Sequence, residues 1–197
     1  MVADVIDTLA GIAPGSPLDA ARNRRTVARQ QAQASYLSLF NPKAMGGVSA
    51  QERCAVACFV AGLHGQPQAE AFYGSALGEA GGSAALKAAI ALAVAAGKTQ
   101  GPYGAYPKGP LSKEDTTGLV YKVASDVALT LGRRLVAAFE HTHMLVFHPR
   151  DAAESSLQSL LDAGWTTDDV VTLSQLVAFL AFQIRVVAGL RVLASKM

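Results

Sequence analysis

The chain has 197 residues, a formal net charge of +2 at neutral pH and two cysteines. This length suits one domain with a sizeable core, and the small net charge gives no indication of a nucleic-acid or membrane partner. Hydrophobic residues make up 51% of the chain and charged residues 16%. So few charged residues leave a surface that is poor in charge, and we therefore expect a homo-oligomer, whether dimer, trimer or hexamer.

At the N-terminus, Val2–Ala10 predicts a short amphipathic helix and Leu18–Phe40 predicts a second, longer one. Asp4 and Asp7 interrupt the apolar residues of the first helix. This pattern is not typical of a secretory signal peptide, so the cytoplasm is the default location. Two cysteines in a chain of this size do not form a disulfide framework either.

The second predicted helix carries a local cluster of positive charge. Its members are Arg22, Arg24, Arg25 and Arg29. No aromatic residues alternate with these arginines, so the stacking platform of a single-strand nucleic-acid binder is absent. We interpret the cluster as a solvated helix face or as a set of interface salt bridges.

A capping box opens the central part of the chain. Ser49 and Glu52 have the S-x-x-E spacing in which the serine oxygen and the carboxylate satisfy each other's backbone amides. This start predicts a helix that runs to about Leu63. Two further helices are expected after it, over Pro67–Leu77 and Ser83–Ala96.

The segment Gly97–Leu111 is rich in glycine and proline, which excludes a long helix. We interpret this loop as a subunit-contact arm, as a lid over a pocket or as a disordered segment. Further helical segments are predicted from Ser112, over Ser125–Phe147 and Asp151–Ala163, and from a cap at Thr166 or Thr167 to about Ser195.

No segment alternates polar and apolar residues with period two between turn signals, so no β-strand is predicted. The apolar run Leu176–Ile184 is much shorter than the ~20 residues that cross a bilayer. The sequence therefore predicts an all-α protein. We expect residues 1–47 to form an N-terminal helical extension and residues 48–197 to form a helical domain that folds as one unit.

Two segments carry a family resemblance. Val48–Leu77 has a polar-capped helix start, a turn at Gly65 and a second helix start at Pro67, and Leu161–Leu190 has a short turn followed by a long apolar helix. Both resemble the alkylhydroperoxidase-D (AhpD) and carboxymuconolactone-decarboxylase (CMD) family. The resemblance implies an AhpD-like helical bundle with an N-terminal helical arm.

In redox members of that family, two cysteines at the start of the second hairpin helix attack and resolve peroxide, and a Glu and a His move protons. Aligned on Gly65, this chain has Gln66 and Ala69 at the cysteine positions, Tyr73 at the histidine position and Cys54 at the glutamate position. Glutamine and alanine form neither a sulfenic acid nor a disulfide.

The resemblance therefore implies a non-redox enzyme of the CMD type, which acts on a small anionic substrate and needs no cofactor. A non-catalytic oligomeric scaffold or partner protein is one alternative. A residual peroxidase that uses Cys54 is another.

The two cysteines, Cys54 and Cys58, are spaced i, i+4 on one predicted helix. Their Cβ atoms are then about 5–6 Å apart, whereas a disulfide needs about 3.5–4.5 Å. We interpret the two thiols as small buried core groups, or Cys54 as a single reactive thiol that faces a pocket.

Four polar residues crowd the end of the helix predicted over residues 125–147. They are Glu140, His141, His143 and His148. Histidines two apart on a helix point about 200° away from each other, so His141 and His143 do not share a metal ion and no metal site is predicted. Interaction with the helix dipole is sufficient to explain histidines at this end.

Arg185 lies inside the apolar last helix. A lone buried charge costs several kcal/mol in typical proteins, so we expect this guanidinium to be paired. Its partner is expected to be Glu52 or Glu140, or the carboxylate of a substrate.

If the chain is an enzyme, we expect its pocket between the central hairpin and the last helix. The predicted catalytic residues are Cys54, Tyr73 and His143. The predicted substrate-binding residues are Arg185, Gln66 and His141.

Overall fold

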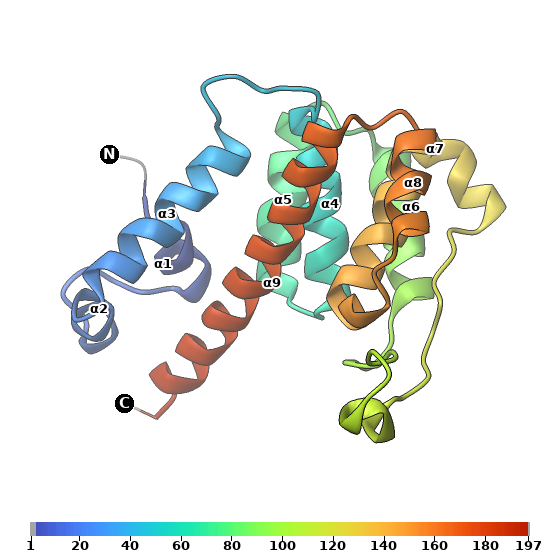
Figure 1. Ribbon diagram of the computed structural model, residues 1–197. Coiled ribbons are helices and arrows are strands. Elements are labelled where there is room, and N and C mark those ends of the chain that lie inside the picture. Colours follow the sequence, from blue (N-terminus) through green and yellow to red (C-terminus); the bar gives the residue numbers. More distant parts are fainter. Residues whose placement is uncertain (1–2, 197) are drawn as a thin grey trace.

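The computed structural model describes residues 3–196, which form helices and connecting segments without a β-strand. The prediction of an all-α protein is confirmed (Figure 1). The helices of the N-terminal half are α1 (Val5–Ala10), α2 (Pro17–Asn23), α3 (Thr26–Phe40), α4 (Ala50–Leu63), α5 (Pro67–Glu79) and α6 (Ala84–Gly97). Those of the C-terminal half are α7 (Ser125–Phe147), α8 (Glu154–Asp162) and α9 (Thr167–Ala194), with short 3-10 helices η1 (Pro110–Glu114) and η2 (Pro149–Asp151).

Helix α4 is the centre of the core. It contacts α5, α6, α7 and α9, and most of its residues are buried. Its start is the predicted capping box, in which the Glu52 amide donates to Ser49 Oγ at 3.2 Å and the Ser49 amide donates to the Glu52 carboxylate at 2.9 Å. Phe59 of α4 stacks on Phe139 of α7 with ring centroids 4.3 Å apart. An offset aromatic pair of this kind fixes the spacing of the two helices.

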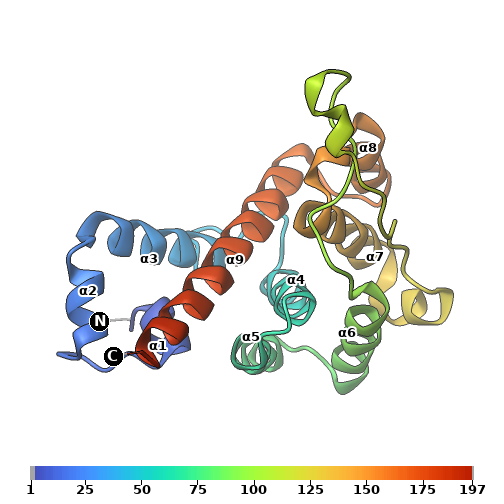
Figure 2. The same ribbon diagram turned by 90° about the horizontal axis from the view of Figure 1, so that it is seen from below.

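Helix α9 lies between the N-terminal helices and the rest of the bundle (Figure 2). Within residues 3–196 it is the one helix that is long and apolar enough to cross a membrane, and core helices of soluble proteins meet the same criterion. Phe182, Val192 and Leu193 of α9 remain exposed, and Phe182 and Leu193 line a groove that α9 forms with α2 and α3. An apolar exposed face is compatible with a partner subunit, and the expected homo-oligomer stays a prediction.

The prediction of one helix over Leu18–Phe40 is wrong, because the chain breaks between α2 and α3. Arg25 has φ −118° and ψ 50°, which is not helical. The break brings Arg22 and Arg29 to the same two aspartates of α1, its N-cap Asp4 and Asp7. Arg22 is buried, so part of the arginine cluster forms ion pairs within the chain and is not a solvated face.

Two other boundaries differ from the prediction, and one helix has a kink. The helical segment expected at Ser112 is the 3-10 helix η1, and the helix expected over Asp151–Ala163 begins only at Glu154, as α8, after the 3-10 helix η2. Helix α7 is kinked at Gly132, where φ is 72° and ψ is 160°. The expected start of the first helix at Val2 lies outside the described residues.

One arginine connects the starts of α4 and α9 to α7. Arg134 Nε donates to the Glu52 carboxylate at 2.7 Å, and its terminal nitrogens donate to the carbonyls of Gly47 and Gly164. The guanidinium carbon lies 4.1 Å from the ring centroid of Trp165, whose indole N–H donates back to the Arg134 carbonyl. The Glu52 carboxylate therefore caps its own helix, α4, and also binds Arg134 of α7.

We expect Arg134→Ala to lower the free energy of unfolding by about 2 kcal/mol, because it removes charge-assisted hydrogen bonds and a cation–π contact. Urea denaturation followed by circular dichroism measures this change. Arg24→Ala is the matched control, since Arg24 is exposed and its loss is expected to cost less than about 0.5 kcal/mol. Equal midpoints for the two variants would contradict this role of Arg134.

Two glycines within helices give opposite expectations. Gly132 has backbone angles that only glycine adopts readily, so Gly132→Ala is expected to cost about 1–3 kcal/mol. A Cβ atom at Gly74 of α5 would meet no atom within 4 Å, so Gly74→Ala is expected to stabilise the protein by about 0.5–1 kcal/mol. The midpoint of thermal unfolding, measured for both variants, tests these expectations. A higher midpoint for Gly132→Ala than for the wild type would rule out the kink.

Candidate functional site

The structure does not bring the predicted catalytic residues together in an open pocket. Tyr73 is fully buried; its hydroxyl donates to Gln183 Oε1 of α9, and its ring stacks on Phe40 of α3 at 5.2 Å between centroids. Burial raises the pKa of the Tyr73 hydroxyl far above its usual range. Tyr73 is therefore a core residue that joins α5 to α3 and α9.

Both cysteines lie on α4 and neither is at the turn around Gly65. Cys54 is buried and Cys58 is half-buried. Burial raises the pKa of the Cys54 thiol to about 11 and that of the Cys58 thiol to about 12. Because the thiolate is the nucleophile, thiols with such pKa values are nearly inert at neutral pH.

The helix start after Gly65 lies where the sequence predicts it. Gly65 has φ 60°, Gln66 is the N-cap of α5 and Pro67 is its first residue. Residues of α1 and α9 cover this start and leave a space of only about 10 Å³ beside Gln66. Too little room remains there for a substrate.

The expectation that Arg185 is buried and paired with an acid is wrong. Its side chain is exposed on α9, and it forms no ion pair with any residue in the range 3–196. Glu52 pairs with Arg134 and Glu140 pairs with Lys122. Although its neighbours in the sequence are apolar, Arg185 lies on an exposed part of α9, where a guanidinium remains hydrated.

A different arginine, Arg53 of α4, is buried in this core. It is 4% exposed and donates to the backbone carbonyls of Leu39, Met45 and Val48. These contacts fix the connection between α3 and α4. Its sequence position gives no signal of burial, because a charged residue in the first turn of a helix is normally solvated.

The histidines of α7 point to two environments. His143 is fully buried, and its Nε2 lies 3.0 Å from the Gly97 carbonyl, which only accepts hydrogen bonds. Nε2 therefore carries the proton, and Nδ1 is left without a partner. Burial lowers the pKa of His143 to about 4. His143 is a neutral core residue under most conditions.

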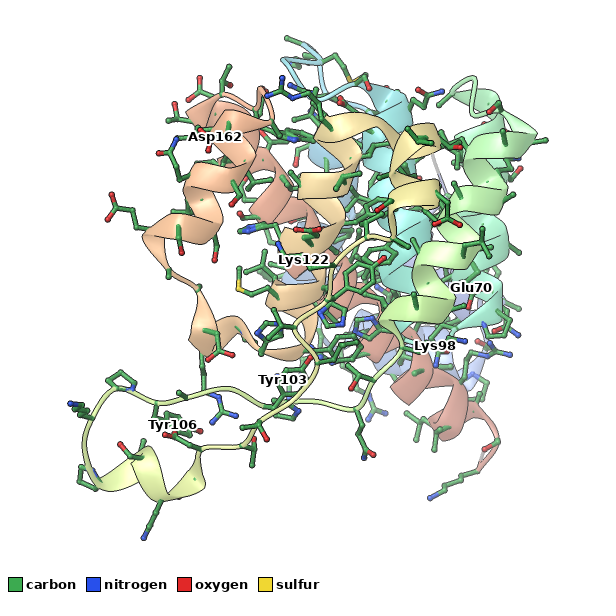
Figure 3. All side chains as sticks on the ribbon, turned by 90° about the vertical axis from the view of Figure 1, so that its right-hand side faces the viewer. Glu70, Lys98, Tyr103, Tyr106, Lys122 and Asp162 are labelled. Carbon is green, nitrogen blue, oxygen red and sulfur yellow. The ribbon has the colours of Figure 1, made fainter. Side chains whose placement is uncertain are left out.

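His141 lies on another side of α7, where it lines a polar pocket of about 420 Å³, and its Nε2 lies 3.4 Å from Ser174 Oγ of α9. The pocket lies between α7, η2, α8 and the segment 120–122, of which Lys122 is labelled in Figure 3. Its polar lining consists of Tyr121, Lys122, Glu140, His141, His148, Asp151, Ser155, Ser156 and Ser159. The volume lies in the range typical of small-molecule sites.

His148 and Asp151 are hydrogen-bonded to each other in the wall of this pocket. His148 Nδ1 lies 3.0 Å from Asp151 Oδ2. A carboxylate only accepts, so Nδ1 donates and Nε2 has the free lone pair in the neutral ring. Asp151 also accepts from the Ala105 amide at 2.9 Å, which orients the carboxylate. The pair has the arrangement of a general base and the group that positions it.

Sequence reasoning missed this pair. The signal is the H-P-R-D spacing that follows α7, which was interpreted only as the end of one helix and the start of the next. Its meaning depends on the 3-10 helix η2, which turns Asp151 back toward His148. No group of three or more potential metal ligands gathers within the described part of the chain.

The irregular segment after α6 packs against this site. The Tyr103 amide donates to the Phe147 carbonyl, and the Tyr103 ring stacks on His148 at 4.9 Å between centroids. Tyr103 and Tyr106 mark this segment in Figure 3, where it extends beyond the helices. The stacking fixes the plane of the His148 ring. Further along the same segment, residues 120–122 form one wall of the pocket.

A scan of protein-family models finds no match to this chain, and neither does a search of curated proteins or of solved structures. The geometry of the residues themselves is therefore the basis for any functional conclusion.

The buried His143 predicts a pH dependence of stability. Its folded pKa, about 4, lies below the ordinary value of 6.5, so between these values the unfolded chain binds a proton that the folded chain does not. Stability is therefore lost as the pH falls from about 6.5 to 4, by up to about 1.4 kcal/mol per pH unit from this group. Denaturant unfolding of wild type and His143→Leu at several pH values is the test. We expect a shallower dependence in the variant, and equal slopes would refute the assignment.

Proposed function

We propose that this chain is a non-redox enzyme on an AhpD/CMD-like scaffold, in which His148 acts as a general base on a small substrate. The observation that carries the proposal is the hydrogen bond between His148 and Asp151 in the wall of the polar pocket. The resemblance of Val48–Leu77 and Leu161–Leu190 to the AhpD and CMD family supports the scaffold.

Asp151 would keep the His148 ring in the tautomer that leaves Nε2 able to accept a proton. When His148 becomes an imidazolium, the adjacent carboxylate would stabilise its charge. Tyr103 stacks on the ring, and the Ala105 amide holds Asp151. Both contacts reduce the freedom of the base, which is a condition for efficient proton transfer.

The charges of the pocket favour a substrate that is uncharged at its reacting end. Lys122 is already paired with Glu140, and Asp151 adds a negative charge beside His148. The expected anchor for an anion, Arg185, does not line this pocket. Hydrolysis of a small ester or lactone by a water molecule that His148 deprotonates fits these conditions.

The redox alternative has little physical support. The raised pKa of Cys54 leaves almost no thiolate at neutral pH. The scaffold alternative does not explain why an oriented base lines a pocket of substrate size.

The proposal is tested with a panel of small aryl esters and lactones, by following proton release. We expect turnover of at least one compound, and a loss of about 10²–10⁴-fold in kcat/KM in His148→Ala and Asp151→Asn. Added imidazole should restore part of the rate in His148→Ala alone, which a merely structural role would not predict.

His64→Gln is the control, because His64 lies at the C-cap of α4 and does not line the pocket. It should retain the wild-type rate. Equal rates in wild type and His148→Ala would refute the proposal. Peroxide consumption that Cys54→Ser abolishes would favour the peroxidase instead.

A further inference from the structure

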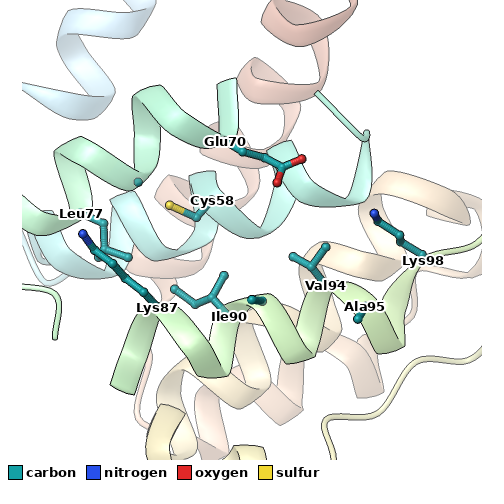
Figure 4. Close-up of a pocket in the computed structure, with 10 residues that line it drawn as sticks. Cys58, Glu70, Leu77, Lys87, Ile90, Val94, Ala95 and Lys98 are labelled. Carbon is teal, nitrogen blue, oxygen red and sulfur yellow. The ribbon is translucent and has the colours of Figure 1, made fainter. Parts of the chain in front are cut away.

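A second pocket lies between α5 and α6, next to the central helix α4. It is a groove of about 350 Å³ with Cys58 of α4 in its floor (Figure 4). Its apolar walls are formed by Leu77, Ile90 and Val94. The charged groups around it are Glu70, Lys87 and Lys98. No residue of this groove belongs to the His148 pocket.

Gly74 of α5 lines the groove, and Gly78 of α5 lies next to Lys87. Gly74 and Gly78 are spaced i, i+4 and so share one face of the helix. A Cβ atom at Gly74 would meet no atom within 4 Å, whereas one at Gly78 would lie 2.9 Å from Lys87 Nζ. Glycine inside a helix is less stable than alanine. At position 74 no neighbouring atom explains the glycine, and at position 78 the glycine makes room for the ammonium of Lys87.

The charges at the two ends of the groove differ. Figure 4 shows Glu70 and Lys98 near one end, on opposite sides, and Lys87 at the other end beside Leu77. Among residues 3–196, none forms a salt bridge with Lys87 or hydrogen-bonds to its ammonium. The Lys87 end therefore carries an unbalanced positive charge next to an apolar surface.

Neither Lys87 nor Lys98 forms an ion pair with any residue in the range 3–196, but Glu70 lies across the groove from Lys98, whereas Lys87 stands alone at its end. A cation of this kind next to an apolar wall suits an amphipathic anion. We propose that the groove binds a medium-chain carboxylate. Its head group would lie on Lys87, and its hydrocarbon chain would run along Ile90 and Val94 over the Cys58 thiol. The thiol is uncharged at neutral pH, because burial raises its pKa, and so forms part of the apolar floor.

Calorimetric titration with octanoate and with its uncharged analogue octanamide tests this site. In the wild-type chain we expect saturable binding at one site, with octanoate preferred by about fivefold, the size of an exposed ion pair. Lys87→Gln should bind both ligands with equal affinity. Lys113→Gln is the matched control, since Lys113 of η1 does not line the groove, and it should keep the preference.

A blocking variant locates the site. Gly74→Leu fills open space without backbone strain, so it should fold, as circular dichroism will show, and should abolish saturable octanoate binding. In the wild type, octanoate should shift the amide resonances of Gly74 and Gly78. The absence of saturable binding, equal affinity for the two ligands in the wild type, or unchanged binding by Gly74→Leu would each overturn the proposal. His148→Ala should bind octanoate normally, so the result is independent of the proposed catalytic function.

Discussion

The contact between the Glu52 carboxylate and the Arg134 guanidinium joins three helices at one end of the bundle. Glu52 closes the capping box of α4, and Arg134 spans from it to the carbonyl of Gly164 just before α9. The Trp165 ring covers the guanidinium. A charge with this many partners is held in a single geometry, so the relative positions of α4, α7 and α9 depend on it.

Both pockets follow from that arrangement. Because α7 is fixed at Arg134, the kink at Gly132 changes the course only of its first turns, and the remainder carries Glu140, His141 and Met144 as one face toward α8. Helix α4 fills the middle of the bundle, and the two pockets share no lining residue. The polar pocket beside α8 and the apolar groove beside α5 are consequently separate sites with different chemistry.

Local signals predicted most helices, and tertiary contacts decided the rest. The caps at Ser49, Ser83 and Thr166 act through hydrogen bonds to residues three positions away, so they are legible in the sequence. The break at Arg25 cannot be predicted from the sequence in this way, because it depends on the ion pairs that Arg22 and Arg29 form with Asp7 of α1. Burial of Arg53 and exposure of Arg185 likewise depend on packing between helices. The His148–Asp151 pair needs both η2 and the loop that carries Tyr103.

The N-terminal helices explain why chemistry is absent from the hairpin face that the family resemblance indicates. Phe40 of α3 stacks on Tyr73, and Leu9 of α1 lies beside Gln66, so apolar side chains occupy the space above the start of α5. Ala69 and Tyr73 on this face are buried, whereas Gln66 is only partly buried. Restoring cysteines at Gln66 and Ala69 would therefore place the second of them at a buried position, where desolvation disfavours the thiolate. In this chain Ala69 and Tyr73 of the hairpin serve as core, and the His148–Asp151 pair lies where α7 ends, next to a loop that packs on it without closing the pocket.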